Sequence, residues 1–401
     1  MYTIEKIMSD VNCTSFPERW RELFPEVIKE YEANGCIYSK PEYYVDLFNK
    51  YELDEVLLPT FTHAAEVIDT DESFKIFLLL TCFALRDRSQ ISELSSFVQP
   101  RSPLGVNDVK YDMLTALCMC SMMDYTYEMM LGKGYSRETT LSVIRLFLNG
   151  IRGFRERHDG ADGYDLIRWF QLAIDGRLIP YTSGLQAETG CIFGCDAVIV
   201  ENKEGETKIF AVNNEIHSSG RILGSLFAED TEGSWISEYT ETDTEFSGYV
   251  FNERGLVEKN RITLKKDHWT AKLRKGDPVI SMHIPRGVPI NDEALDSFFG
   301  WVEEFFKDNG HKAVVCGSWL IDPVLKDILG ENSNIVSFQN HFLKVSVKNA
   351  GKAVFKFIFK KPDDNFDINE LPENTRLEKA VKHMYLNNKA VYELYGVILR
   401  K

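Results

Sequence analysis

The pattern of apolar residues changes close to residue 160, and this change constrains the fold more strongly than any other feature of the sequence. Before it, apolar side chains recur three and four residues apart, as between Trp20 and Tyr31, which is typical of amphipathic helices. After a Gly- and Asp-rich stretch over 157–163, short segments of strand-like alternation take over. This order predicts an α+β protein, with an all-helical domain over 1–160 and a mixed β-sheet domain with flanking helices over 161–401.

The individual elements follow from the same patterns. In the first domain, helical spacing predicts helices over 16–34, 41–50, 72–86, 108–131 and 136–152. One more helix is predicted over 163–175, and strands are then predicted over 196–200, 207–212, 248–251 and 278–284. The rest of the second domain is predicted to form helices over 291–308, 322–329 and 375–387 and strands over 313–317, 335–347, 352–360 and 391–399.

The composition is that of a soluble globular chain with an acidic balance. Its 401 residues carry 61 Asp and Glu against 46 Lys and Arg, a formal net charge of −15. This balance disfavours sequence-independent nucleic-acid binding and adhesion to an anionic membrane surface, because both require positive charge. The most apolar stretch, 76–85, has about half the length that a membrane span needs. The expected partner is a small-molecule substrate, with no nucleic acid and no membrane, and the oligomeric state stays open.

The N-terminal segment and the cysteines indicate a cytoplasmic protein. The chain starts without the basic and apolar segments of a secretory signal. Its eight cysteines are sparse for its length, which is typical of a reduced compartment. Cys191 and Cys195 have a spacing that could supply two zinc ligands, but no second Cys or His pair follows at the spacing of a zinc finger. We therefore expect no metal.

Two oppositely charged segments precede the C-terminal part of the chain. Residues 229–245 contain seven acids and no base, a balance of −7, whereas residues 254–275 contain eight bases and two acids, a balance of +6. One interpretation is a pair of solvated loops that touch each other. The other is a local positive field for an anionic ligand on an otherwise acidic protein.

The stretch over 276–291 is the most informative for chemistry. It predicts an apolar strand that ends at His283, a loop rich in Gly and Pro, and a helix capped by Asn291. A loop of this kind can expose backbone N–H groups at a helix N-terminus, where an anion binds favourably. Asp292 and Glu293 in the first helical turn would, however, repel a phosphate placed there.

Four ordered motifs resemble those of a known family. They are Gly276-Asp277 with His283-Ile284-Pro285, Cys316-Gly317-Ser318-Trp319-Leu320-Ile321-Asp322-Pro323, Ser333-Asn334-Ile335, and Leu371-Pro372-Glu373-Asn374-Thr375-Arg376-Leu377. Together they resemble a bacterial family of acyltransferases that joins a helical N-acyltransferase N-terminal domain to a C-terminal domain similar to the GCN5-related N-acetyltransferases (GNAT). The match is specific over the motif-bearing C-terminal part and looser over 165–275, while the N-terminal half matches in character only.

The resemblance implies a GNAT-like fold and an acyl-CoA or acetyl-CoA co-substrate. In that fold the strand over 278–284 splays away from the strand over 313–317, and the loop over 285–290 holds the pyrophosphate. The residues that would bind the co-substrate are Ile284, Arg286, Gly287 and Val288. The loop departs from the family's glycine-rich pattern, because it has one glycine and a proline that donates no N–H.

Amine acylation needs a base for the amine proton and an acid for the leaving thiolate. His283 is the first candidate for the base because histidine changes charge near neutral pH, although a buried structural role would also explain it. Ser318 and Glu215 are further catalytic candidates; Asp322 is better explained as a helix cap. The first hypothesis is an acyl-CoA-dependent acyltransferase with an unknown amine acceptor. The alternatives are a non-catalytic GNAT-like binding or assembly module and, more weakly, a hydrolase that uses Ser318.

Overall fold

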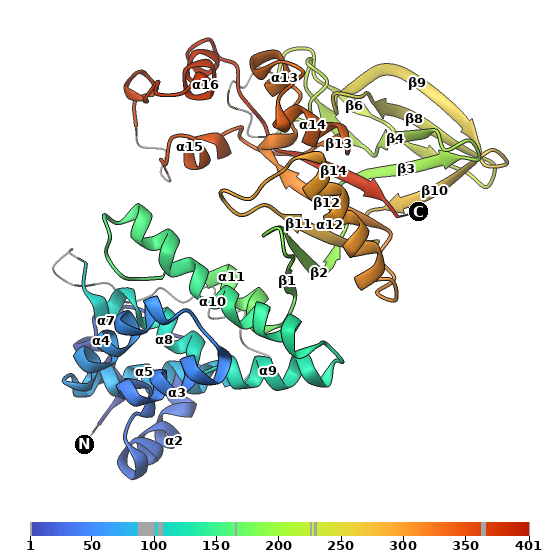
Figure 1. Ribbon diagram of the computed structural model, residues 1–401. Helices are drawn as coiled ribbons and strands as arrows, with labels where there is room; N and C mark the ends of the chain where they lie inside the picture. The colour runs from blue at the N-terminus through green and yellow to red at the C-terminus, as the bar shows by residue number, and fades with distance from the viewer. Residues whose placement is uncertain are drawn as a thin grey trace. The chain divides into compact units, whose positions relative to one another are not determined.

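A computed structural model of the protein describes residues 2–86, 100, 102, 107–164, 167–224, 227, 231–361 and 366–400. The chain forms two compact units, Met1–Pro180 and Tyr181–Lys401 (Figure 1). The change of sequence pattern near residue 160 therefore falls inside the first unit. The predicted fold class is confirmed, since the first unit is built from helices and the second contains mixed β-sheets with helices.

The first unit consists almost entirely of helices. They are α1 (Ile4–Asp10), α2 (Arg19–Asn34), α3 (Pro41–Tyr51), α4 (Leu58–Asp69), α5 (Glu72–Arg86), α7 (Val109–Asp112), α8 (Leu114–Cys120), α9 (Met123–Gly132), α10 (Arg137–Arg157) and α11 (Ile167–Ile174), followed by the short strand β1 (Leu178–Pro180). The single helix predicted over 108–131 is divided into α7, α8 and α9 by turns at Met113 and Met122. The helix predicted from 136 is α10, and Ser136 caps it by accepting from the Thr139 N–H.

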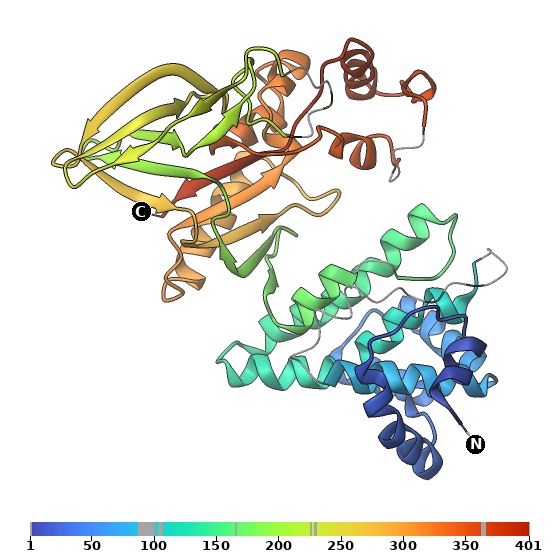
Figure 2. The ribbon, with the colours of Figure 1, turned by 180° about the vertical axis from the view of Figure 1, so that it is seen from behind.

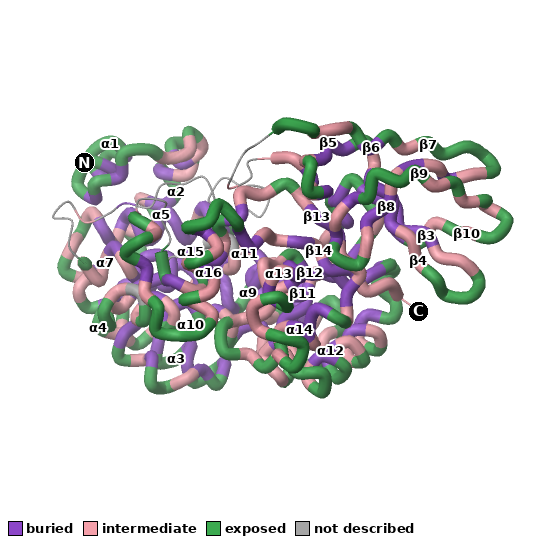
Figure 3. The backbone as a smooth tube through the Cα atoms, turned by 90° about the horizontal axis from the view of Figure 1, so that it is seen from above, coloured by how far each residue is buried: buried purple, intermediate pink, exposed green. Residues whose placement is uncertain are grey.

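The apolar stretch over 76–85 lies in α5, at the centre of the first unit's core. Nine of its ten residues are buried, and the exception, Phe83, packs against the core. Figure 3 shows buried residues gathered in the interior of the helical unit and exposed ones along its outer turns. Among the described helices, none combines the length and apolar character needed to cross a bilayer.

The second unit contains two larger sheets and one small one (Figure 2). In the first sheet the neighbouring strands are β2 (Gln186–Ile192), β11 (Pro278–His283), β12 (Ala313–Ser318), β14 (Leu394–Leu399) and β13 (Leu343–Ser346). The β11–β12 pair is parallel and the other pairs are antiparallel. The second sheet contains β10 (Trp269–Arg274), β3 (Ala197–Asn202), β4 (Thr207–Ala211), β8 (Glu245–Phe251), β7 (Thr240–Glu241) and β9 (Val257–Lys265), and the small sheet pairs β5 (Asn214–Ile216) with β6 (Trp235–Ser237).

The second sheet is inserted between two neighbouring strands of the first. The Phe193 N–H donates to the Asp277 carbonyl (2.8 Å), and the Gly276 N–H donates to the Phe193 carbonyl (2.8 Å). The chain thus leaves β2 and returns into β11 at one point, as in a hairpin whose turn has been replaced by residues 194–275. The two sheets share a core that includes Ile199, Val279 and Val397. Burial of this apolar surface holds the insertion against the first sheet.

Among the described residues of the second unit, five α-helices lie in its C-terminal part. They are α12 (Asp292–Phe305), α13 (Val324–Leu329), α14 (Asn334–Asn340), α15 (Ala353–Phe357) and α16 (Arg376–Leu386). The strand predicted over 352–360 is wrong, because this segment forms α15. The prediction over 335–347 is wrong in its first half, which is α14, and correct in its second half, which is β13. In α15, buried Val354 and Phe355 point into a core of neighbouring helices, so tertiary packing outweighs the strand propensity of the apolar residues.

Candidate functional site

The central strands β11 and β12 pair at one end and separate at the other. Their parallel register covers Val279–Ala313, Ile280–Val314 and Ser281–Val315. Beyond Ser281, β11 continues beside β2 as far as His283, and β12 continues beside β14 as far as Ser318. Each strand therefore keeps its outer neighbour while its pairing with the other has ended. The early end of the β11–β12 ladder agrees with the predicted splay, and His283 and Gly317 lie on the two strands beyond it.

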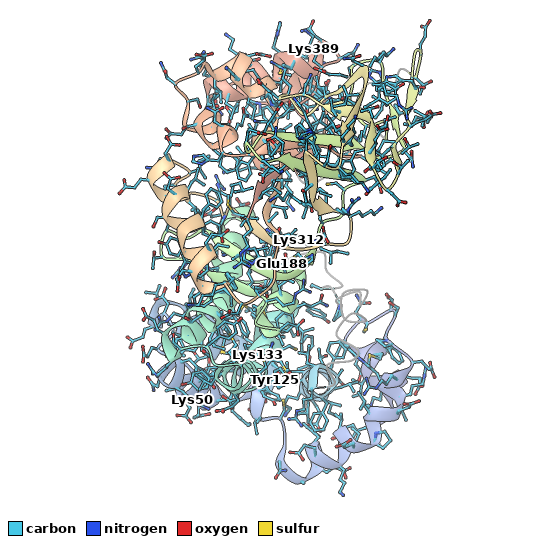
Figure 4. All side chains as sticks on the ribbon, turned by 90° about the vertical axis from the view of Figure 1, so that its right-hand side faces the viewer. Lys50, Tyr125, Lys133, Glu188, Lys312 and Lys389 are labelled. Atoms are coloured by element: carbon cyan, nitrogen blue, oxygen red, sulfur yellow. The ribbon has the colours of Figure 1, made fainter. Side chains whose placement is uncertain are left out.

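His283 contacts a buried acid on the adjacent strand. Its Nε2 atom lies 2.8 Å from Oε2 of Glu188 in β2. The Glu188 side chain is 8% exposed and that of His283 is 25% exposed. Figure 4 labels Glu188 among the side chains of the second unit. The sequence analysis identified His283 and missed Glu188, which lies 95 residues earlier in the chain.

A β-bulge places Glu188 on the same face as His283. In the antiparallel ladder of β2 and β11, Val279 pairs with Cys191, but Ser281 pairs with Glu188. Three residues of β2 thus span the distance that two residues of β11 span, and Gly190 in the bulge has a φ of +70°. Because side chains alternate between the faces of a strand, one extra residue reverses which side chains of β2 face His283. Without it, the neighbours of Glu188 would occupy that face.

The loop after β11 contains the four residues predicted to bind the co-substrate. Ile284 and Val288 are partly buried, whereas Arg286 and Gly287 are exposed. The Val288 N–H donates to the Pro285 carbonyl (3.2 Å), and Gly287 adopts a φ of +82° that closes this turn. The turn leaves the Arg286 side chain exposed on the surface of the loop.

One of the two acids at the start of α12, Asp292, is hydrogen-bonded to side chains at the neighbouring helix α14. Asn291 caps α12 by accepting from the Ala294 N–H (3.0 Å). Asp292 accepts from the Ser337 hydroxyl (2.6 Å) and lies 3.0 Å from Nε2 of His341, so its carboxylate is held toward α14. The hydrogen bonds from Ser337 and His341 lower the pKa of Asp292. Asp292 therefore keeps its negative charge, and its carboxylate is hydrogen-bonded to Ser337 and His341.

The two other catalytic candidates lie in different places. Ser318 ends β12 at the open side of the splay, and its Oγ accepts from the Leu320 N–H (3.1 Å). Glu215 lies in β5, in the small sheet, with an exposed side chain and Ile236 as its partner in the ladder. Ser318 thus shares the splay with His283, whereas Glu215 belongs to a different sheet. The Cys316 thiol is buried, and desolvation raises its pKa to about 12, as expected for a structural thiol.

The acidic and basic segments contact each other. Six of the eight bases over 254–275 lie within ion-pair distance of acids: Arg254, Arg261, Lys266, Lys272, Arg274 and Lys275. Glu241 of the acidic segment pairs with both Lys266 (2.8 Å) and Arg274 (2.7 Å). The interpretation as touching segments is confirmed, although they form strands rather than loops; Glu229 and Asp230 lie outside the described residues. Most of the local positive charge is therefore neutralised within the protein.

Neither the Cys191–Cys195 pair nor Cys118 and Cys120, two residues apart in the first unit, forms a metal centre in the described part of the chain. Cys118 and Cys120 are buried in α8, and Cys195 is buried at the start of the inserted sheet. Desolvation raises the pKa of Cys195 to about 12, which disfavours the thiolate that binds zinc. Among the described residues, no three His, Cys, Asp or Glu side chains gather in an arrangement that could hold a metal ion.

Comparisons with known proteins agree with this geometry. Residues 214–398 match the family model of the GNAT-like C-terminal domain. No curated protein sequence matches the chain. The fold is similar to solved structures described as an acyltransferase in complex with decanoyl-CoA and teicoplanin (15% identity, 98% of each chain, TM-score 0.59), an acyltransferase mutant in complex with octanoyl-CoA (15%, 99% of each, 0.58) and an acyltransferase in complex with CoA and 10C-teicoplanin (14%, 98% of each, 0.59).

The predicted resemblance is confirmed by two kinds of similarity. The family-model match begins in β5, inside the inserted segment, and ends in β14, so it includes both strands of the splay and the loop between β11 and α12. The structural similarity extends over nearly the whole chain, including the helical unit. Residues 214–398 are thus similar to the GNAT-like C-terminal domain, and the chain as a whole has a fold similar to that of these solved structures.

Proposed function

We propose that the protein is an acyl-CoA-dependent acyltransferase that transfers an acyl group to an amine acceptor. The separation of β11 and β12 beyond Ser281 is the observation that supports this function most strongly. Backbone N–H and C=O groups on the facing edges of two separated strands can bind the amide groups of a pantetheine arm. In a closed sheet these backbone groups would pair with each other.

The loop over 285–290 fits the phosphates of the donor in part. Pro285 and Pro289 have no N–H, and the Val288 N–H is used within the turn, so the loop has fewer backbone donors than a glycine-rich one. The exposed guanidinium of Arg286 can supply the missing interaction, because it binds phosphate oxygens bidentately. We assign Ile284, Arg286, Gly287 and Val288 to donor binding on this basis.

We assign the general base to His283, which lies where β11 leaves β12. The acceptor nitrogen attacks the thioester carbonyl, a C–N bond forms, and the amine proton passes to the imidazole. The C–S bond then breaks, and the thiolate leaves as CoA after taking a proton from the imidazolium or from water. Ser318, whose oxygen already accepts from a backbone N–H, keeps a hydroxyl hydrogen that it can donate to the bound substrate.

Ligand-induced thermal stabilisation tests donor binding. Acetyl-, octanoyl- or decanoyl-CoA at about 100 times its Kd is expected to raise the Tm by several degrees, since such binding adds about 2.7 kcal/mol. Gly317→Val adds a branched side chain to β12 beyond the end of its ladder with β11, against the Tyr395 ring (3.1 Å from the Cβ position), and is expected to abolish this shift. Gly300→Val, on α12 with open space around its Cβ position, is the matched control. Unchanged Tm values for the wild type with all three donors would contradict the proposal.

Release of the CoA thiol in the presence of amines tests catalysis. His283→Ala is expected to lower kcat about 10²- to 10⁴-fold and to keep the Tm shift, because a general base contributes to the chemical step. The proline-containing loop favours a second candidate, a non-catalytic module that binds the acyl donor. Stabilisation by acyl-CoA without thiol release for any amine would support the module and reject the enzyme.

A further inference from the structure

We propose that Glu188 is the positioning residue for His283 and fixes the imidazole tautomer so that Nδ1 accepts the proton from the amine. This inference rests on the proposed function and extends it to a residue on another strand. It is drawn from the contact between Nε2 of His283 and Oε2 of Glu188, from the burial of the carboxylate, and from the bulge that aims it.

The bulge is the first argument. Bulges often re-aim a side chain next to an active site. With regular pairing continued from Val279–Cys191, the odd-numbered residues of β2 would face His283 and Ser281, and these are Ala187 and Thr189. The extra residue brings Gln186 and Glu188 to that face instead. The left-handed conformation at Gly190, which L-residues with a side chain adopt only at a cost, makes this geometry possible.

The burial of the carboxylate is the second argument. A carboxylate that is 8% exposed is costly unless a hydrogen-bond donor or a positive charge faces it. Nε2 of His283 supplies one such donor at 2.8 Å. A carboxylate has no hydrogen to give, so Nε2 must carry one. Proton acceptance then falls to Nδ1, the second nitrogen of the ring.

The dyad has a defined role in the transfer step. When the acceptor nitrogen forms its bond to the thioester carbon, its proton moves to Nδ1 and the imidazole becomes a cation. Glu188 does not take the proton; its negative charge stabilises the imidazolium and holds the ring in place. When the C–S bond breaks, the electron pair stays on sulfur, and the proton on Nδ1 returns to the thiolate or to water.

Nitrogen-15 NMR of the histidine side chains tests the tautomer without any assay of activity. We expect the Nε2–H tautomer for His283 in the wild type at pH 8, with its signals identified by their loss in His283→Gln. In Glu188→Gln the side-chain amide can donate as well as accept, so the single tautomer is expected to give way to a mixture. Glu258→Gln, which removes an exposed acid of β9, is the matched control and should keep the wild-type pattern.

Steady-state kinetics then test the positioning role. Glu188→Gln is expected to lower kcat about 10²-fold with an unchanged KM for acyl-CoA, and Glu188→Asp, which keeps the charge, to recover part of the loss. In a His283→Ala background, Glu188→Gln should cause no further loss, because residues that act through one another are not additive. If Glu188→Gln fails to fold, the kcat of Glu188→Asp tests the positioning role instead.

The outcomes separate the two proposals. Wild-type tautomer and wild-type kcat in Glu188→Gln, with transfer lost in His283→Ala, would overturn the role of Glu188 and leave the acyltransferase intact. If the wild-type protein transfers no acyl group from any donor, the proposed function fails, and the NMR pattern alone decides the role of Glu188. Retention of the Nε2–H tautomer in Glu188→Gln would then overturn it.

Discussion

Two buried acids of the second unit, Asp322 and Glu188, are paired with basic side chains in opposite ways. Asp322 is 1% exposed and accepts from Arg221 (3.0 and 3.1 Å) and from the N–H groups of Val324 (3.1 Å) and Tyr392 (2.8 Å). Glu188 is 8% exposed and faces His283, whose side chain lies at the open end of β11.

The difference lies in whether the basic partner can change its charge. Arg221 stays protonated, and backbone N–H groups do not titrate. Asp322 therefore permanently joins the segment after β5, which contains Arg221, to the start of α13 and to the segment before β14. Histidine gains and loses a proton near neutral pH. The first arrangement can only stabilise the fold, whereas the second can also exchange a proton with a ligand.

The largest expected effect is on the stabilising pair. Asp322→Ala should lower the free energy of unfolding by about 3–5 kcal/mol, because it leaves the Arg221 charge buried without its acid. Asp327→Ala, which removes an exposed acid paired with Arg254, should cost less than about 1 kcal/mol. Urea denaturation measures both. Equal losses in the two variants would show that Asp322 is no more structural than a surface acid.

A substitution in the bulge is expected to cost less stability than Asp322→Ala and to lower the activity as well. Gly190→Ala should cost about 1–2 kcal/mol, because alanine at a φ of +70° is strained. If relaxation of this strain moves Glu188 off the His283 face, kcat should fall by about tenfold or more. Gly194→Ala, at an exposed glycine with open space around it, should change neither quantity. Full activity with reduced stability would separate the bulge from the site.

The same two acids and their basic partners show how much of the site the sequence could predict. His283 was predictable because it ends an apolar strand within a recognisable motif. Glu188 was not, since β2 reads Gln-Ala-Glu-Thr-Gly-Cys-Ile, has little apolar alternation, and pairs with β11 only after the insertion over 194–275. The sequence placed Asp322 at the start of the helix that follows, but the N-cap of α13 is Pro323, and Asp322 lies one residue earlier and accepts from the Val324 N–H. Its ion pair was not predictable, because Arg221 lies 101 residues away and only the folded chain brings them together.

His311 is a third case, a buried histidine near an acid, Glu303, whose opposing effect on its pKa is outweighed. It is 2% exposed, and neither ring nitrogen has a hydrogen-bond partner among the described residues. Desolvation, helped by the positive charge of Arg400, lowers its pKa. The unfolded chain therefore binds a proton at a higher pH than the folded one, and stability should fall as the pH drops below about 6.5, by at most about 1.4 kcal/mol per pH unit.

Denaturation curves between pH 8 and pH 5 measure this effect. His311→Phe should flatten the dependence over that range, because the proton uptake of the unfolded state is removed. His268→Gln, at a side chain that is 72% exposed, should leave the dependence unchanged. If the free energy of unfolding depends on pH identically in the wild type and in His311→Phe, the dependence comes from other groups and not from His311.

The smallest effect is expected at Glu241, the exposed counterpart of Asp322. Hydrogen bonds from Arg274 and then Lys266 lower the pKa of Glu241 to about 2. A lowered carboxyl pKa stabilises the fold above the ordinary value of about 4.5, and the contribution disappears as the pH falls toward 2. Because the side chain is 26% exposed and solvent screens it, Glu241→Gln should cost less than about 1 kcal/mol at pH 7. The cost should shrink in 1 M salt, which distinguishes this surface pair from the buried one, since Asp322→Ala should cost the same at both salt concentrations.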